Sequence, residues 1–123
     1  MTENDIEIRF GVNAYNLFDE NKSVLDSQIQ DFLNSSLNVD ILSGQFSQYK
    51  KIVKTMVERY IKNFEEELKV LRIEVKRYEA LINGSLDNIK FKNLYESRKK
   101  DLEKRINIIE PQIDVLKNIL DRL

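Results

Sequence analysis

The chain has 123 residues, of which 33% are charged and 41% hydrophobic, and its formal net charge is −1. This length accommodates one domain with a modest core, and the low content of Gly (3) and Pro (1) favours long helices over a loop-rich β-fold. No run of about 18 apolar residues predicts a membrane span. The acidic N-terminus lacks the pattern of a Sec signal peptide. We therefore expect a cytoplasmic protein, or one assembled into a particle.

The sequence contains neither Cys nor His. Disulfides and thiolate chemistry are therefore excluded, and zinc and copper sites lose their usual ligands. Ser–His and Cys–His pairs cannot form, and the commonest general base is missing. Residues 65–67 are three consecutive Glu, but their carboxylates diverge around a helix, which leaves open only a carboxylate site for Mg²⁺ or Ca²⁺ shared between chains. We expect no cofactor, no metal site and no catalytic site.

Residues 1–44 are predicted to form an N-terminal arm and a short helix. Polar and apolar residues alternate strictly from Asp5 to Phe10, which is typical of a strand with Ile6, Ile8 and Phe10 on one face. Because an isolated strand is unstable, this strand would pair with another copy or another protein. The alternative is an irregular arm that packs the same three residues on a helix.

The rest of the N-terminal region is expected to be helical in two places. Apolar residues within 13–18 suggest one or two helical turns. A helix is predicted over residues 23–35, with Ser23 as its N-cap. Residues 37–44 would then connect this helix to the remainder of the chain.

A stretch of 37 residues without Gly or Pro carries apolar side chains at a mean spacing of 3.6 residues, the period of an α-helix. The stripe comprises Phe46, Tyr49, Val53, Met56, Tyr60, Phe64, Leu68, Leu71, Val75, Tyr78 and Ile82. At about 1.5 Å per residue, this predicts a rod of roughly 55 Å. A rod with one continuous apolar stripe must lie against another element.

Residues 45–123 are predicted to form a long αα-hairpin that turns at Asn83–Ser85, with Gly84 as a left-handed cap and Ser85 or Asp87 as the next N-cap. In the second arm, apolar residues step by 4, 3, 4, 3, 4 and 3, which is a coiled-coil seam. That seam comprises Leu102, Ile106, Ile109, Ile113, Leu116, Leu120 and Leu123. Pro111 lies inside it, and we favour one kinked helix over two helices because the seam stays in register. The predicted fold class is therefore all-α: a coiled-coil-like antiparallel hairpin, a short N-terminal helix and an extended N-terminal arm.

The two long helices carry more apolar residues than one seam can bury, so a third element or another chain must cover the surplus. The predicted helix at 23–35, roughly 20 Å long, covers less than half of the rod. The predicted partner or oligomer interface comprises Ile6, Ile8, Phe10, Ile52, Val57, Ile61, Val70, Ile73, Phe91, Ile108, Val115 and Ile119. The alternative is that the N-terminal third closes a three-helix bundle by itself.

Charge is divided unevenly along the chain. Residues 1–48 carry 8 acidic and 2 basic side chains, whereas residues 49–123 carry 13 acidic and 18 basic ones. This asymmetry would attract the N-terminal region to the hairpin, within one subunit or between subunits. The alternative is a solvated surface with no such role.

A locally basic region follows the predicted turn. One interpretation is a patch that contacts the phosphates of a nucleic acid. The other is the ordinary polar face of a helix, because pairs such as Glu96–Lys100 and Asp101–Arg105 are four residues apart. No recognised nucleic-acid-binding motif accompanies the region, so we rank nucleic acid below protein as a partner. The candidate patch comprises Lys90, Lys92, Arg98, Lys99, Lys100, Lys104 and Arg105.

Together these features predict a non-enzymatic structural or assembly protein. It would be an oligomerising helical subunit of a larger complex, with a virus or phage particle as one setting, and would act through its apolar helix faces. Its partners would be other copies of the chain, another protein, or both. The alternative is a helical adaptor, chaperone or inhibitor of a single protein, and a nucleic-acid-binding protein is the third hypothesis.

Overall fold

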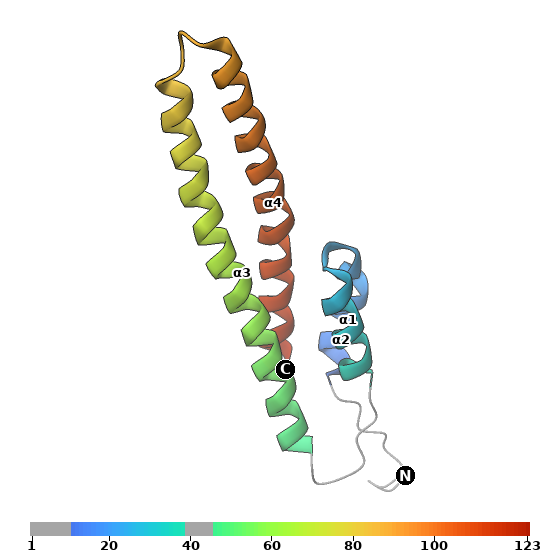
Figure 1. Cartoon of the computed structure of the whole chain (residues 1–123). Coiled ribbons are helices and arrows are strands. Elements are labelled where there is room, and N and C mark those ends of the chain that lie inside the picture. The colour runs from blue at the N-terminus through green and yellow to red at the C-terminus, as the bar shows by residue number, and fades with distance from the viewer. Residues whose placement is uncertain (1–10, 39–45) are drawn as a thin grey trace, which may run out of the picture. The chain divides into compact units, whose positions relative to one another are not determined.

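The structure, a computed structural model, describes residues 11–38 and 46–123 (Figure 1). In these ranges it contains four α-helices, one 3₁₀-helix and no strand. The helices are α1 (Val12–Asn21), η2 (Lys22–Val24, the 3₁₀-helix), α2 (Ser27–Leu37), α3 (Phe46–Asn83) and α4 (Ile89–Arg122). The all-α prediction is therefore confirmed for these ranges. The predicted strand containing Ile6, Ile8 and Phe10 lies outside the described residues.

The chain divides into two compact units, and α3 and α4 contribute to both. Unit 1 consists of residues 1–61 and 112–123, so that its described part holds α1, η2, α2, the start of α3 and the end of α4. Unit 2 is Lys62–Pro111, which holds the rest of α3 and α4 and the turn between them. In unit 1, the N-terminal helices share a core with the start of α3 and the end of α4.

Unit 1 has the larger core. In α2, the buried residues Ile29, Leu33 and Leu37 recur every four residues and form one face. All described core residues of unit 1 are less than a tenth exposed, and each such aliphatic or aromatic side chain contributes about 1.5–3 kcal/mol when fully buried. The core comprises Ala14, Phe18, Leu25, Ile29, Leu33, Leu37, Val53, Val57, Ile61, Ile113, Val115, Leu116, Ile119 and Leu123.

Helix α1 begins at a glycine because the backbone there is left-handed. Gly11 has φ 62° and ψ 34°, and its carbonyl accepts a 2.6 Å hydrogen bond from the Tyr15 N–H. A Cβ at this position would lie 3.1 Å from Leu37 Cδ2 and 3.5 Å from Leu123 Cδ2. Both the dihedral angle and the close packing therefore favour glycine here.

Helix α2 begins later than predicted. Residues 22–24 form η2, Leu25 is extended, and Asp26 takes the N-cap position that the sequence assigned to Ser23. The short α1 predicted over 13–18 is confirmed and longer, since it spans Val12–Asn21.

In unit 2, α3 and α4 run antiparallel as a helical hairpin (Figure 1). Phe64 and Leu68 of α3 and Ile109 of α4 are buried along the seam. The prediction of one long helix from about residue 45 to residue 82 is confirmed to within one residue at each end.

Helix α4 remains a single helix through Pro111, as the register of the seam predicted. Pro111 cannot donate a hydrogen bond to the carbonyl of Asn107. Both residues are exposed, so water can reach that carbonyl.

The turn between α3 and α4 differs from the prediction. The left-handed conformation predicted for Gly84 is wrong, because Gly11 is the only described residue with a positive φ. Instead the chain stays right-handed: the Gly84 N–H donates to the Ala80 carbonyl at 3.0 Å. The N-cap of α4 is Asn88, whose Oδ1 accepts a 3.2 Å hydrogen bond from the Phe91 N–H, and not Ser85 or Asp87.

Candidate protein-interaction surface

Four of the predicted interface residues belong to the core of unit 1. Val57, Ile61, Val115 and Ile119 are at most 9% exposed. The structure corrects their assignment to an interface with another chain. The reason is that α1 and α2 together supply more apolar surface than the single helix predicted at 23–35.

The other described members of the predicted interface are exposed on helices. Ile52, Val70, Ile73, Phe91 and Ile108 are between 50% and 61% exposed. Sequence reasoning left out three further exposed apolar residues near the turn, where the apolar stripe is irregular. These are Leu86, Ile89 and Leu94.

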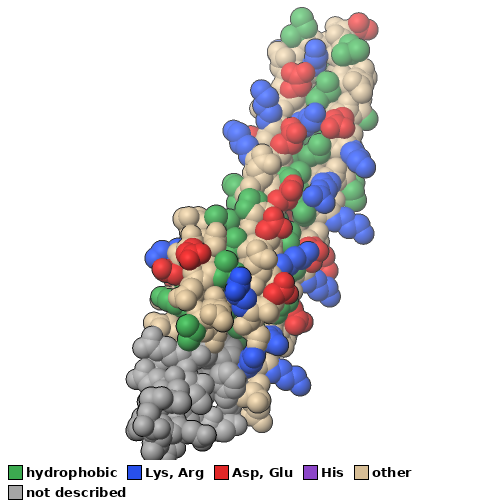
Figure 2. All heavy atoms as spheres, turned by 180° about the vertical axis from the view of Figure 1, so that it is seen from behind, with side chains coloured by type: hydrophobic (Ala, Val, Ile, Leu, Met, Phe, Trp, Pro, Cys, Tyr) green, Lys and Arg blue, Asp and Glu red, His purple; other side chains and the backbone are tan. Residues whose placement is uncertain are grey.

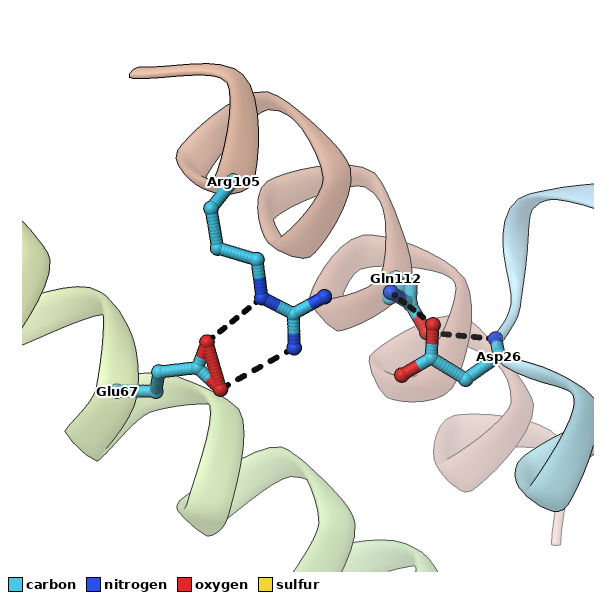
Figure 3. Close-up of polar contacts among 4 residues, drawn as sticks. All are labelled: Asp26, Glu67, Arg105 and Gln112. Carbon is cyan, nitrogen blue, oxygen red and sulfur yellow. Dashed lines mark hydrogen bonds and ion pairs between the residues drawn. The ribbon is translucent and has the colours of Figure 1, made fainter. Parts of the chain in front are cut away.

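One side of the unit 2 hairpin, which we call the Arg105 flank, combines apolar and charged side chains. Its stripe on α4, where residues step alternately by 3 and 4, comprises Phe91, Leu94, Arg98, Asp101, Arg105 and Ile108. Its stripe on α3, with the same steps, comprises Glu67, Val70, Glu74 and Arg77. Arg105 Nε donates a hydrogen bond to Glu67 Oε2 at 2.8 Å, and Arg105 Nη2 donates one to Glu67 Oε1 at 3.2 Å (Figure 3). This bidentate pair places the two stripes on the same side of the hairpin.

The opposite side of the hairpin is rimmed by charges. Arg72 lies five residues after Glu67, which is about 140° around the helix, and pairs with Glu110 at 3.6 Å. Lys99 pairs with Glu79 at 3.5 Å. An open groove of about 340 Å³ lies there, lined by Arg72, Val75, Lys76, Glu79, Glu103, Ile106 and Asn107. On the face seen in Figure 2, a line of hydrophobic side chains runs between charged ones along the hairpin.

The predicted basic patch does not gather on one face. Arg105 is held by Glu67 and Lys99 by Glu79, on opposite sides of the hairpin. Arg98, Lys99 and Lys100 are consecutive and therefore point about 100° apart. This distribution favours the ordinary polar surface of a helix over a surface shaped to follow a phosphate backbone. The remaining members of the patch are Lys90, Lys92 and Lys104.

Sequence reasoning missed a buried polar contact in unit 1. Gln112 is 0% exposed, and its Oε1 accepts a 2.9 Å hydrogen bond from the Asp26 backbone N–H. Its Nε2 donates in return to Asp26 Oδ1 at 3.2 Å (Figure 3). The pair joins the start of α2 to α4. No pattern could reveal it, because the residues are 86 positions apart in the chain.

Unit 1 also has an open apolar groove on α3. The groove has a volume of about 430 Å³ and surrounds the exposed side chain of Ile52. It is lined by Gln48, Lys51, Ile52, Thr55 and Met56. All five of these described residues lie on α3.

Within the described ranges, no three Asp or Glu side chains come together as metal ligands. No described helix is both apolar enough and long enough to cross a membrane. Comparison with protein-family models, curated proteins and solved structures found no match. The exposed apolar side chains of α3 and α4 are therefore the features on which a functional proposal can be built.

Proposed function

We propose that the protein is a non-enzymatic structural or assembly protein, an oligomerising helical subunit of a larger complex. The observation that carries this proposal is the Arg105 flank, where Val70, Phe91, Leu94 and Ile108 are between 45% and 60% exposed. Single exposed apolar residues are common on monomers, whereas exposed apolar surface that gathers on one side of a molecule marks an interaction site; these four residues lie on one flank of the hairpin. Association would remove this apolar surface from water.

The larger complex is proposed on general grounds. Long helices with exposed apolar side chains suit assemblies such as virus or phage particles, and the chain lacks His, the commonest general base, and Cys, a common nucleophile. We further propose that the α3–α4 seam packs as a coiled coil, because the apolar residues of α4 from Leu102 to Leu123 keep the alternating steps of 3 and 4.

The experiment is a measurement of molar mass by light scattering over a wide range of concentrations. We expect species heavier than the 14.6 kDa chain, in proportions that rise with concentration. A single 14.6 kDa species at every concentration would contradict oligomerisation. If that monomer then retained one dominant protein from its host, the adaptor hypothesis would replace the present proposal.

A further inference from the structure

We infer that a second copy of the chain docks on the Arg105 flank, so that two unit 2 hairpins pack flank to flank as a four-helix bundle. This inference rests on the proposed function and specifies its partner and surface. Four-helix bundles built from two antiparallel hairpins are a common solution for hairpins with an uncovered apolar flank. A two-fold arrangement requires the same surface from both copies.

The apolar residues of unit 2 select this flank over the opposite one. Val70 and Ile108 lie one helical turn on either side of the Glu67–Arg105 pair, and Phe91 and Leu94 continue the α4 stripe. On the opposite side, the apolar floor of the groove is half-buried between the rim charges Arg72, Lys76, Glu79 and Glu103, and Ile89 is the one strongly exposed apolar residue of α4 in step with Lys99 and Glu103. A docked copy would therefore bury more apolar surface on the Arg105 flank.

The charges of the flank favour a second copy as the occupant. The flank carries three acidic and three basic side chains, so a copy of the same surface meets no net repulsion. A strongly acidic or strongly basic partner would feel no net electrostatic attraction to a flank whose charges balance. The charged residues are Glu67, Glu74, Asp101, Arg77, Arg98 and Arg105.

The spacing along α4 also predicts how the two copies would be aligned. If two α4 helices lie antiparallel with Arg98 opposite Asp101 of the other copy, the same alignment places Phe91 opposite Ile108. Both pairings then occur twice, once on each side of the two-fold axis. Leu94 would face the aliphatic stem of Arg105, whose guanidinium is already held by Glu67.

Unit 1 shows that this chain buries the equivalent positions when a helix covers them. Gln112, Val115 and Ile119 keep the same alternating steps along α4 and are all buried. Asp26, at the start of α2, bonds directly to Gln112. Side chains at these positions therefore suit contact with a covering helix.

The first test uses sedimentation to measure how tightly copies associate when Asp replaces apolar residues on the Arg105 flank or an apolar residue outside it. Leu94→Asp combined with Ile108→Asp should raise the dissociation constant of the oligomer at least about 100-fold. Ile73→Asp is the matched control, because Ile73 is 56% exposed on α3 but lies outside both stripes. Circular dichroism verifies that each variant remains helical.

The second test uses the absence of cysteine in the chain, which allows a single thiol to be introduced at will. Phe91→Cys and Ile108→Cys chains, mixed and oxidised, should form a disulfide-linked dimer. Phe91→Cys chains alone should not, because the alignment keeps the two thiols about 25 Å apart.

The outcomes separate this inference from the proposed function. The chain can oligomerise in a way that contradicts the docking surface. If only Ile73→Asp dissociates the oligomer, or if the mixed cysteine chains fail to cross-link, the docking surface is wrong and the proposed function stands. If the unmodified chain is monomeric at every concentration, both fail. If the Leu94→Asp, Ile108→Asp variant dissociates, and if disulfide-linked dimers form only when the two cysteine chains are mixed, the docking surface and the proposed function are both supported.

Discussion

Gly11 is the residue whose identity is most tightly constrained by the backbone. Its positive φ and the 3.1 Å approach of Leu37 Cδ2 to a Cβ position both disfavour any side chain. Gly84 provides a natural comparison, because its φ is not positive and a Cβ there would make ordinary contacts, at 3.5 Å or more.

We expect Gly11→Ala to lower the free energy of unfolding by about 1–2 kcal/mol, since alanine is strained in the left-handed region. Gly84→Ala should instead be neutral or raise it by up to about 1 kcal/mol, because alanine restricts the unfolded chain. Urea unfolding of both variants measures the difference. Equal losses from the two substitutions would show that the left-handed conformation at Gly11 is not required.

Gln112 and Asp26 form a reciprocal pair in which each residue both donates and accepts a hydrogen bond. We expect Gln112→Glu to lower the free energy of unfolding by about 1–3 kcal/mol at neutral pH, because a buried carboxylate would then face Asp26 instead of an amide donor. Adding Asp26→Asn should restore most of the loss, since the new amide can donate to the new carboxylate.

The control for this pair is Asp26→Asn alone, which keeps an oxygen for Gln112 Nε2 and should change stability little. Comparison of the four proteins forms a double-mutant cycle. Additive effects of the two substitutions would show that the side chains do not interact.

At the scale of elements, periodicity predicted α3 and α4 well because long helices repeat their apolar pattern over many turns. The turn and the N-caps were predicted less accurately. Ser85, Asp87 and Asn88 are all residue types that are preferred at an N-cap, so the sequence does not distinguish between them. The covering of Val57, Ile61, Val115 and Ile119 could not be predicted, because it depends on α1 and α2 folding against distant parts of the chain.

Pro111 within α4 leads to a prediction about helix stability. Proline in a helix interior is disfavoured by about 3 kcal/mol relative to alanine. Because Pro111 is exposed, we expect Pro111→Ala to raise the thermal midpoint of unfolding. Asn118→Ala, at another exposed position of α4, is the control and should have an effect of only about 0.5 kcal/mol. A lower midpoint for Pro111→Ala would mean that the proline-induced geometry is needed for packing.

At the scale of the whole molecule, the two units have unequal cores. Unit 1 buries apolar residues from α1, α2, α3 and α4, whereas in unit 2 only Phe64, Leu68 and Ile109 are buried. Local stability follows the number of buried contacts. Unit 2 is therefore the part of the chain with most to gain from a partner.

Hydrogen exchange measured by mass spectrometry should show this difference. In dilute solution we expect the amides of residues 112–122 to exchange more slowly than those of residues 89–105. If copies associate at higher concentration as proposed, protection of residues 91–108 should increase. Uniform protection along α4 in dilute solution would indicate that unit 2 needs no covering surface.

The proposed interaction surface was only partly predictable from the sequence. Val70, Phe91 and Ile108 stand out by their positions away from the seam, and the structure leaves them exposed. Leu94 could have been found from its place between Phe91 and Arg98 on the same stripe. The choice of flank required the Glu67–Arg105 pair, which joins residues 38 positions apart.

The alternating steps along the hairpin have a consequence for its length. The pattern repeats every seven residues, or about 10 Å of helix. Adding seven residues to each arm beside the turn would extend the hairpin by that increment while every original side chain kept its orientation. Adding one residue would rotate the helix beyond it by about 100° and turn the stripes away from their partners. The length of this hairpin can therefore change in fixed increments of about 10 Å while its existing contacts are kept.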